Sequence, residues 1–174
     1  SLTIEEGRTV ALVGASGSGK TTIARLIPRF WDVREGSVTI GGTDVRKMDK
    51  AELMHSVSFV FQNARLFKTT ILENVRYGCP GATISEVNRA IDLSQSREII
   101  SRLPQGLNTL IGSEGTYLSG GEQQRIVLAR AILKNAPIVV LDEATAFADP
   151  ENEHLIRQAL AHLTRGKTVL MIAH

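Results

Sequence analysis

The sequence has a single cysteine, only 5% aromatic residues and a net charge of just +2. Because Cys79 has no second cysteine to pair with, an internal disulfide is excluded, and we interpret it as an incidental reduced thiol. So small a net charge gives no indication of a nucleic-acid partner or of an acidic membrane surface. No stretch approaches the roughly 18 apolar residues needed to span a bilayer, and no signal peptide is evident. We therefore expect neither a nucleic-acid partner nor a membrane-spanning helix among these residues.

What remains is an ordinary globular composition, with 43% hydrophobic and 22% charged residues in a chain of 174. That length is enough for one domain with its own core and for a subdomain. Residues 1–4 alternate like part of a strand, and the sequence stops at His174, directly after an apolar strand-like run. We expect the sequence to be a fragment of a longer domain that folds poorly by itself.

A glycine-rich stretch at residues 14–22 organises the chain. It matches G-x-x-x-x-G-K-[ST], the pattern of a phosphate-binding P-loop. Glycines let backbone N–H groups turn toward phosphates, Lys20 supplies a positive charge for the β- and γ-phosphates, and the Thr21 hydroxyl can ligate Mg²⁺. An apolar run precedes the stretch and a helix start follows it, which a chance Gly/Ser turn would not require. The expected nucleotide-binding residues are Gly14, Ala15, Ser16, Gly17, Ser18, Gly19, Lys20, Thr21 and Thr22.

Secondary-structure signals alternate between strand and helix at both ends of the chain and are mostly helical in the middle. Strands are expected at residues 9–13, 37–40, 57–61, 138–141 and 168–172, and helices at 20–27, 50–55, 83–93, 96–103, 120–134 and 150–163. The last two strands are continuous apolar runs, which is typical of parallel strands that are covered on both faces. We predict an α/β fold with a parallel-sheet core.

The predicted core also carries a small antiparallel β edge, indicated by the turn at Gly41-Gly42. Core and edge comprise residues 1–68 and 135–174, and residues 69–134 form an inserted all-helical subdomain. Within that subdomain, Thr83 and Glu86 have the spacing of a capping box at a helix start. We expect Asp149 and Pro150 to begin the helix that follows the second core strand.

Two carboxylates, Asp142 and Glu143, follow the apolar run at residues 138–141. Ligands of open α/β sheets gather at the carboxyl ends of strands, so both side chains would face the triphosphate. Asp142 suits a Mg²⁺ shell, directly or through water, and Glu143 suits a general base that orients and deprotonates the attacking water. By itself the pair could equally be a solvated strand end. The P-loop in the same chain favours the catalytic interpretation.

A second helix start stands out at Leu118-Ser119-Gly120-Gly121-Glu122. Ser119 and the two glycines open a long helix and expose another set of backbone N–H groups. An ordinary N-cap would explain Ser119 alone. Because one nucleotide already has its anion site at the P-loop, a second such helix end on a separate helical segment needs a second phosphate to face.

These motifs together resemble the ATP-binding domain of ABC transporters. They are the P-loop, Gln62, the Leu-Ser-Gly-Gly-Glu signature, Asp142-Glu143 and His174, in the order and spacing of that family. The resemblance covers essentially the whole chain, and a P-loop together with this signature is highly specific. It implies a P-loop NTPase fold that uses ATP and Mg²⁺.

The resemblance also implies a head-to-tail dimer with a second ATP-binding domain. Ser119, Gly120, Gly121 and Glu122 of one protomer would then complete the site around the nucleotide held by the P-loop of the other. Gln62 resembles the residue that links Mg²⁺ or water to a transmembrane partner, and His174 resembles the switch histidine that bonds the γ-phosphate. The implied catalytic residues are Glu143, His174, Gln62 and Lys20, and the implied metal ligands are Thr21, Gln62 and Asp142.

The subtype resembles exporter-type domains, whose transmembrane region is fused upstream and binds the transported substrate. Ala144 after Asp-Glu and the segments at residues 59–63 and 66–75 carry this likeness, and residues 147–152 resemble members linked to iron–siderophore transport. Such a domain acts at the cytoplasmic face of a cell membrane. The alternatives are a soluble ABC ATPase that acts on ribosomes or DNA, which Ala144 and the weak net charge disfavour, and a nucleotide sensor without hydrolysis, which Glu143 disfavours.

Some residues depart from the family pattern. Residues 146–149 read Ala-Phe-Ala-Asp where the family usually has Ser-Ala-Leu-Asp, so only Asp149 matches. Residues 112–115 lack the Gly-Glu-Arg-Gly that exporters often carry before the signature. The aromatic residue that stacks on adenine normally precedes the position of Ser1, so no adenine contact is assigned.

Overall fold

A computed structural model describes residues 1–61, 65–112, 117–143 and 150–173 of the chain. Its elements in chain order are β1 (Thr9–Val13), α1 (Lys20–Leu26), β2 (Thr39–Ile40), β3 (Thr43–Asp44), α2 (Lys50–Ser56), β4 (Val57–Val60), α3 (Ile71–Arg76), α4 (Ile84–Leu93), α5 (Arg97–Arg102), the 3₁₀ helix η1 (Gly106–Asn108), α6 (Gly120–Lys134), β5 (Ile138–Asp142), α7 (Pro150–Thr164) and β6 (Thr168–Ala173). Contacts divide the chain into two compact units. One comprises residues 1–61, 136–144 and 166–174, and the other comprises residues 62–135 and 145–165.

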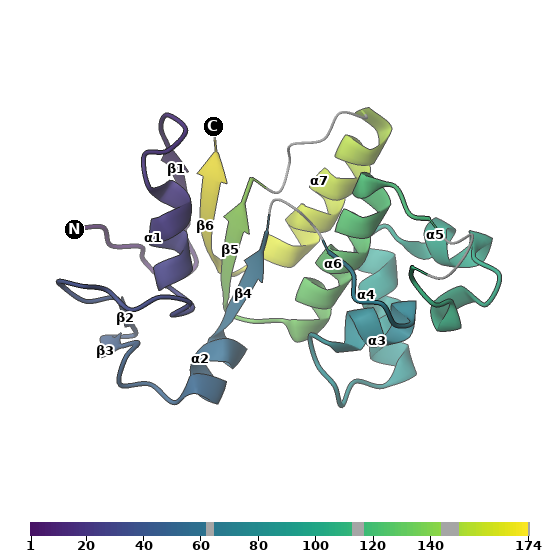
Figure 1. The fold of residues 1–174 in the computed structure, drawn as a ribbon, viewed down its shortest axis with the longest axis horizontal. Helices are drawn as coiled ribbons and strands as arrows, with labels where there is room; N and C mark the ends of the chain where they lie inside the picture. Colours follow the sequence, from purple (N-terminus) through teal and green to yellow (C-terminus); the bar gives the residue numbers. More distant parts are fainter. Residues whose placement is uncertain (62–64, 113–116, 144–149, 174) are drawn as a thin grey trace. The chain divides into compact units, whose positions relative to one another are not determined.

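The first unit is built on a four-stranded parallel sheet in the order β1-β6-β5-β4 (Figure 1). Its register pairs Val13 with Ala173 and Asp142 with Ile172, so the carboxyl ends of β1, β6 and β5 meet at one edge. Side chains of β5 and β6 are mostly buried, as the continuous apolar runs predicted. The sheet therefore carries the chain that follows β1 and the acidic residue that ends β5 to the same edge.

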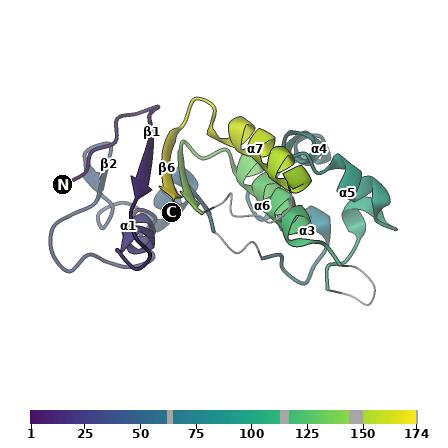
Figure 2. The same cartoon turned by 90° about the horizontal axis from the view of Figure 1, so that it is seen from above.

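Helices α1 and α2 supply the apolar partners of this sheet. Ala24 of α1 and Leu53 of α2 belong to one buried cluster with Val140, Leu170 and Ile172 of the strands. Helix α1 packs against β6 and β5, and Figure 2 shows the unit from above. The fixed packing of α1 against the sheet holds the turn between β1 and α1 in place.

The small antiparallel edge is the pair β2–β3, closed by the turn that the glycines predicted. The alternation at residues 1–4 predicted part of a strand, and this prediction is wrong, because the structure has no strand there. A strand needs a neighbour for its backbone groups, and residues 1–4 take part in none of the described strand pairings.

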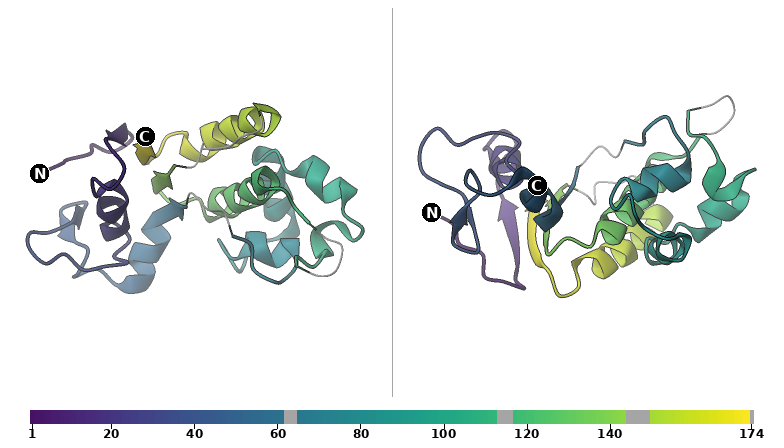
Figure 3. Two further views of the ribbon diagram at one scale, coloured as in Figure 1. Left: turned by 45° about the horizontal axis from the view of Figure 1, so that its top comes forward. Right: turned by 90° about the horizontal axis from the view of Figure 1, so that it is seen from below.

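The second unit is helical and is centred on α6, which packs against α3, α4 and α7. Ile126 and Ala129 of α6 share a buried cluster with Ile71 and Val75 of α3 and with Ile91 of α4. Figure 3 shows α6 in green beside α7 in yellow. Apolar side chains at helical spacing thus fix the long helix whose first residues are the signature.

Local sequence signals set the helix ends of this unit. The predicted capping box of α4 is present, with Thr83 and Glu86 exchanging hydrogen bonds of 2.7 and 3.2 Å. Helix α6 begins at Gly120 and ends at Lys134, as predicted, and Asn135 follows it in a left-handed conformation. Among the helices that the structure describes, none combines the length and apolar character that crossing a bilayer requires.

The predicted α/β class, parallel core, antiparallel edge and helical middle are confirmed. The contact division differs from the predicted subdomain boundaries chiefly at α7, which groups with the helices rather than with the sheet, and residues 62–68 and 135 group with the helices as well. Helix α7 packs along α6, which accounts for that grouping. The functional boundaries of core and subdomain stay a prediction.

Candidate nucleotide-binding site

The predicted P-loop lies between β1 and α1, as its chemistry requires. Residues 14–18 are exposed, and the Ser18 N–H closes a tight turn by donating to the Ala15 carbonyl at 3.2 Å. Gly19 caps α1 with a left-handed φ of 90°, a conformation that a side chain would strain. Its carbonyl already accepts from the Ile23 N–H at 2.9 Å. The loop thus leads into the first turn of α1 with its backbone open to solvent.

Lys20 is buried and its ammonium group is held by the loop itself. The Nζ atom donates to the carbonyls of Gly14 and Ala15 at 2.8 and 2.9 Å, and it lies 3.4 Å from Ser18 Oγ. These partners place a full positive charge inside the concave side of the loop. A triphosphate that enters the loop would meet this charge directly.

Thr21 and Asp142 meet at the mouth of the loop although they lie 121 positions apart in the chain. The Thr21 hydroxyl donates to Asp142 Oδ1 at 3.1 Å, and the Asp142 side chain is 5% exposed. The structure therefore brings together two of the three predicted metal ligands. Hydroxyl and carboxylate oxygens are the ligand atoms that Mg²⁺ takes, so this pair fits the ion.

Glu143 directly follows β5 and leaves the strand through an unusual backbone turn. Its φ is +50°, a left-handed value that is uncommon outside glycine. Its N–H donates to the carbonyl of Ile172 on β6 at 3.3 Å, and the residue is half-buried. The turn is held by the neighbouring strand, so the Glu143 backbone is anchored at the carboxyl edge of the sheet near Asp142.

The signature residues form the first turn of α6 in the second unit. Ser119 is the N-cap, and its hydroxyl accepts from the Glu122 N–H at 3.2 Å. The Glu122 carboxylate reaches back and accepts from the Ser119 N–H at 2.8 Å, which completes a capping box. Ser119 and Gly120 are exposed, whereas Gly121 is buried. The predicted anion site at this helix start stays a prediction, and Ser119 and Gly120 are the residues of it that solvent reaches.

Gly121 is buried because α7 passes directly over it. A Cβ atom at this position would lie 2.7 Å from Asn152 Cγ and 2.8 Å from Asn152 Cβ. The second signature glycine therefore allows the close approach of α6 and α7. The sequence singled out Gly121 as a phosphate ligand, and the structure adds this packing role.

Glu122 is joined by a residue that no motif predicts. Arg102 Nη2, at the end of α5, hydrogen-bonds to Glu122 Oε1, 20 positions away in the chain. Burial alone would raise the pKa of Glu122, but the hydrogen bonds from Arg102 and from the Ser119 N–H lower it below its ordinary value. The sequence of α5 does not predict this pair, because an arginine on a short helix is as common facing solvent as facing a carboxylate.

Three predicted functional residues lie outside the described part of the chain. They are Gln62, His174 and the helix cap Asp149. The departures from the family pattern at residues 113–115 and 146–149 lie there as well. Their roles stay predictions from motif position.

Comparison with known proteins agrees with this geometry. A family model described as ABC transporter matches residues 1–146. ABC transporter B family member 4 of Dictyostelium discoideum is 47% identical over 99% of this chain and 23% of its own length. The mycobactin import ATP-binding/permease protein IrtA of Mycobacterium tuberculosis is 49% identical over 100% of this chain and 20% of its own length. The ATP-dependent lipid A-core flippase of Legionella pneumophila is 47% identical over 98% of this chain and 29% of its own length.

The chain thus spans less than a third of the length of each of these relatives. The match nevertheless covers almost all of the present sequence, including the P-loop, the signature and the acidic pair. The chain belongs to the ABC transporter family, as an ATP-binding domain.

Proposed function

We propose that this domain hydrolyses Mg²⁺-bound ATP in partnership with a second ATP-binding domain, and that hydrolysis powers transport through a membrane-spanning partner. The observation that supports a hydrolytic site most directly is the hydrogen bond between Thr21 and Asp142. It joins the P-loop to the acidic end of β5, and so it supports one site that holds both the phosphates and the ion.

The P-loop residues would bind the triphosphate by exchanging hydrogen bonds within the loop for hydrogen bonds to phosphate oxygens. Lys20 now donates to two carbonyls of its own loop, and it would turn the same ammonium hydrogens to the β- and γ-phosphate oxygens. The backbone N–H groups of residues 16–19 would supply further donors. Charge-assisted hydrogen bonds to phosphate are stronger than the neutral bonds they replace, so the exchange favours the bound state.

Thr21 and Asp142 would hold Mg²⁺ between them and the phosphates, with water filling the other positions. When bound, Mg²⁺ neutralises charge on the phosphate oxygens. The 3.1 Å contact between the two side chains indicates that they already face one point. Gln62 is proposed as a further ligand from its motif position.

Glu143 would orient the attacking water and take its proton. The anchored left-handed turn places this residue immediately beyond the proposed ion ligand Asp142. Water attacks the γ-phosphorus in line with the bond to the leaving ADP oxygen, and that bond breaks to release phosphate. His174 is proposed to bond the γ-phosphate from its motif position.

The signature supports a site shared between two domains. The N-terminal turn of α6 is exposed at Ser119 and Gly120, and the capping hydroxyl of Ser119 still has a hydrogen to donate to an anion. We propose that this turn covers the γ-phosphate of ATP held by the P-loop of a second copy or a related chain. The two sites are then related by the pairing symmetry.

A membrane-spanning partner is supported by the relatives, whose names include a permease and a flippase. They give no support to a soluble ATPase that acts on ribosomes or DNA. We propose that the partner region is fused upstream, that it binds the transported molecule, and that this domain lies on the cytoplasmic side. Mycobactin and the lipid A core, which the relatives' names mention, are the substrates that we propose for the first trials.

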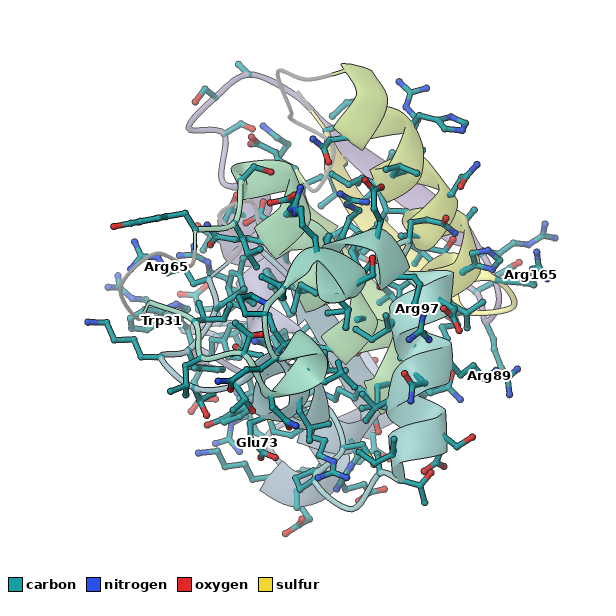
Figure 4. The ribbon with its side chains drawn as sticks, turned by 90° about the vertical axis from the view of Figure 1, so that its right-hand side faces the viewer. Trp31, Arg65, Glu73, Arg89, Arg97 and Arg165 are labelled. Atoms are coloured by element: carbon teal, nitrogen blue, oxygen red, sulfur yellow. The ribbon has the colours of Figure 1, made fainter. Side chains whose placement is uncertain are left out.

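The first unit offers a surface for that partner. A groove of about 620 Å³ is lined by Phe30, Trp31, Met48 and Met54, among others. The side chain of Trp31, labelled in Figure 4, is 65% exposed, and the Phe30 ring packs 5.5 Å from that of Phe59. Aromatic and methionine side chains suit an amphipathic helix. We propose that a cytoplasmic helix of the membrane partner docks there.

The shared site can be tested with two differently tagged copies of the full-length protein in lipid. Lys20→Ala disables the P-loop, and Ser119→Arg blocks the signature. Placed on separate copies, the two changes leave one composite site intact, and about half of the ATP turnover should remain. Placed together on one copy, they damage both sites, and turnover should fall to background. If each site lay within a single chain, the result would be reversed: the changes on separate copies would abolish turnover, and the changes on one copy would leave about half of it.

A further inference from the structure

A carboxylate occupies the helix start that is proposed to face a phosphate. Glu122 is the third residue of α6, and its side chain is only 13% exposed. One of its oxygens accepts from the Ser119 N–H at 2.8 Å, so the carboxylate lies against the turn that carries the donors. An anion that approaches Ser119 therefore approaches a negative charge as well.

That negative charge is present at neutral pH. Burial opposes ionisation of Glu122, but the hydrogen bonds from Arg102 and Ser119, together with the charges of Arg102 and Arg125, lower its pKa below the ordinary value. Left alone, an ionised carboxylate beside a triphosphate would repel it, since like charges repel over several ångströms at a partly buried site. A helix N-terminus attracts anions by its dipole, and an uncompensated carboxylate at the same place weakens that attraction.

Arg102 supplies the countercharge. Its Nη2 hydrogen-bonds to Glu122 Oε1, and the other carboxylate oxygen is taken by the backbone of Ser119, so both oxygens are held. The Arg102 side chain is 59% exposed, and Glu98 on the same helix acts on it as well. Arg125, also positive, is buried and donates to the Gln95 carbonyl at 2.6 Å. Arg102 is thus a cation that bonds the carboxylate directly.

We propose that Arg102 is a positioning residue for ATP: it neutralises Glu122 and keeps that carboxylate turned into the cap, so that the start of α6 accepts the terminal phosphate of a partner's nucleotide. The inference rests on the proposed head-to-tail site. Arg102 acts through Glu122 and touches no reacting atom. The role is electrostatic, and it disappears if position 122 carries no charge.

The test measures ATP turnover against ATP concentration for the full-length protein in lipid. Arg102→Ala should raise the KM for ATP about twofold to fivefold, the range expected from the loss of one partly exposed ion pair, with kcat little changed. Glu122→Gln keeps an oxygen for the Ser119 N–H but removes the charge. The double variant R102A/E122Q should therefore recover the KM of E122Q alone.

The matched control is Arg97→Ala. Arg97 lies on the same short helix beside α4 (Figure 4), its side chain is 49% exposed, and it pairs with Asp92 at 2.7 Å rather than with the signature. Its KM for ATP should stay at the wild-type value. A KM of R102A equal to that of R97A overturns the proposal. A double variant as impaired as R102A also overturns it, because the ion pair would then be merely structural.

Ser119→Arg separates this inference from the function on which it rests. Loss of turnover in S119R together with a normal KM in R102A overturns the role of Arg102 and leaves the shared site standing. Normal turnover in S119R overturns the shared site, and the role of Arg102 with it. Loss of turnover in S119R, a raised KM in R102A and rescue by E122Q support both.

Discussion

Replacing Gly121 by alanine should destabilise the helical unit, because the added methyl group has no room. Its Cβ would lie 2.7 Å from Asn152 Cγ and 2.8 Å from Asn152 Cβ. A rotation of the Asn152 side chain can move Cγ but not Cβ, so α6 and α7 must separate. Overpacking of this kind costs about 1–3 kcal/mol. For a domain of this size, each kcal/mol lowers Tm by about 2–4 °C.

Gly120 provides the matched control. It is the neighbouring residue in the same helix turn, and an added Cβ would meet no heavy atom within 4 Å. Gly120→Ala should leave stability unchanged or raise it by up to about 1 kcal/mol through helix propensity. Urea unfolding of the complete ATP-binding domain, followed by circular dichroism, measures both variants. Equal midpoints would refute the packing role of Gly121, as would the absence of coupling between G121A and Asn152→Gly in a double-mutant cycle.

Two further predictions concern the stability and titration of each unit. Ile126→Ala should lower the free energy of unfolding by about 2–5 kcal/mol, because the side chain is fully buried in the cluster around α6. Ile84→Ala, at a 48% exposed position, should lower it far less. The urea unfolding midpoints of the two variants test this difference. Hydrogen bonds from Arg46 lower the pKa of Asp44 from its ordinary value of 3.8 to about 2. The pairing therefore stabilises the fold fully at a pH above about 3.8, and this stabilisation is lost as the pH falls toward 2. Arg46→Ala removes the side-chain bonds but keeps the backbone N–H that donates to Asp44 at 2.9 Å, so NMR titration should show the Asp44 pKa rising part of the way to its ordinary value. An unchanged Asp44 pKa would contradict the role of the Arg46 side chain.

Features set by local sequence could be predicted well. Helix α6 begins after a Ser-x-x-Glu capping box and continues through apolar residues at helical spacing, and its predicted bounds agree with the structure. The meeting of Thr21 with Asp142 was also predictable, because parallel strands direct their carboxyl ends to one edge. Both inferences need only short-range patterns and one rule of sheet topology.

Features that depend on contacts between distant segments could not be predicted. The bond of Arg102 to Glu122 and the passage of Asn152 over Gly121 arise only when α5 and α7 pack beside α6. The left-handed turn at Glu143 is held by a bond to a neighbouring strand, which no local propensity encodes. The strand expected at residues 1–4 failed for the same reason, since alternation alone does not provide a pairing partner.

The measurement that tests the central account most directly is ATP turnover by Glu143→Gln in the full-length protein in lipid. The amide keeps the size and position of the side chain but cannot take a proton from water. The rate should fall about 10²–10⁴-fold while the affinity for ATP, measured with a fluorescent analogue, stays at the wild-type value. Wild-type turnover in this variant would contradict the role of Glu143 and, with it, the proposed hydrolytic site.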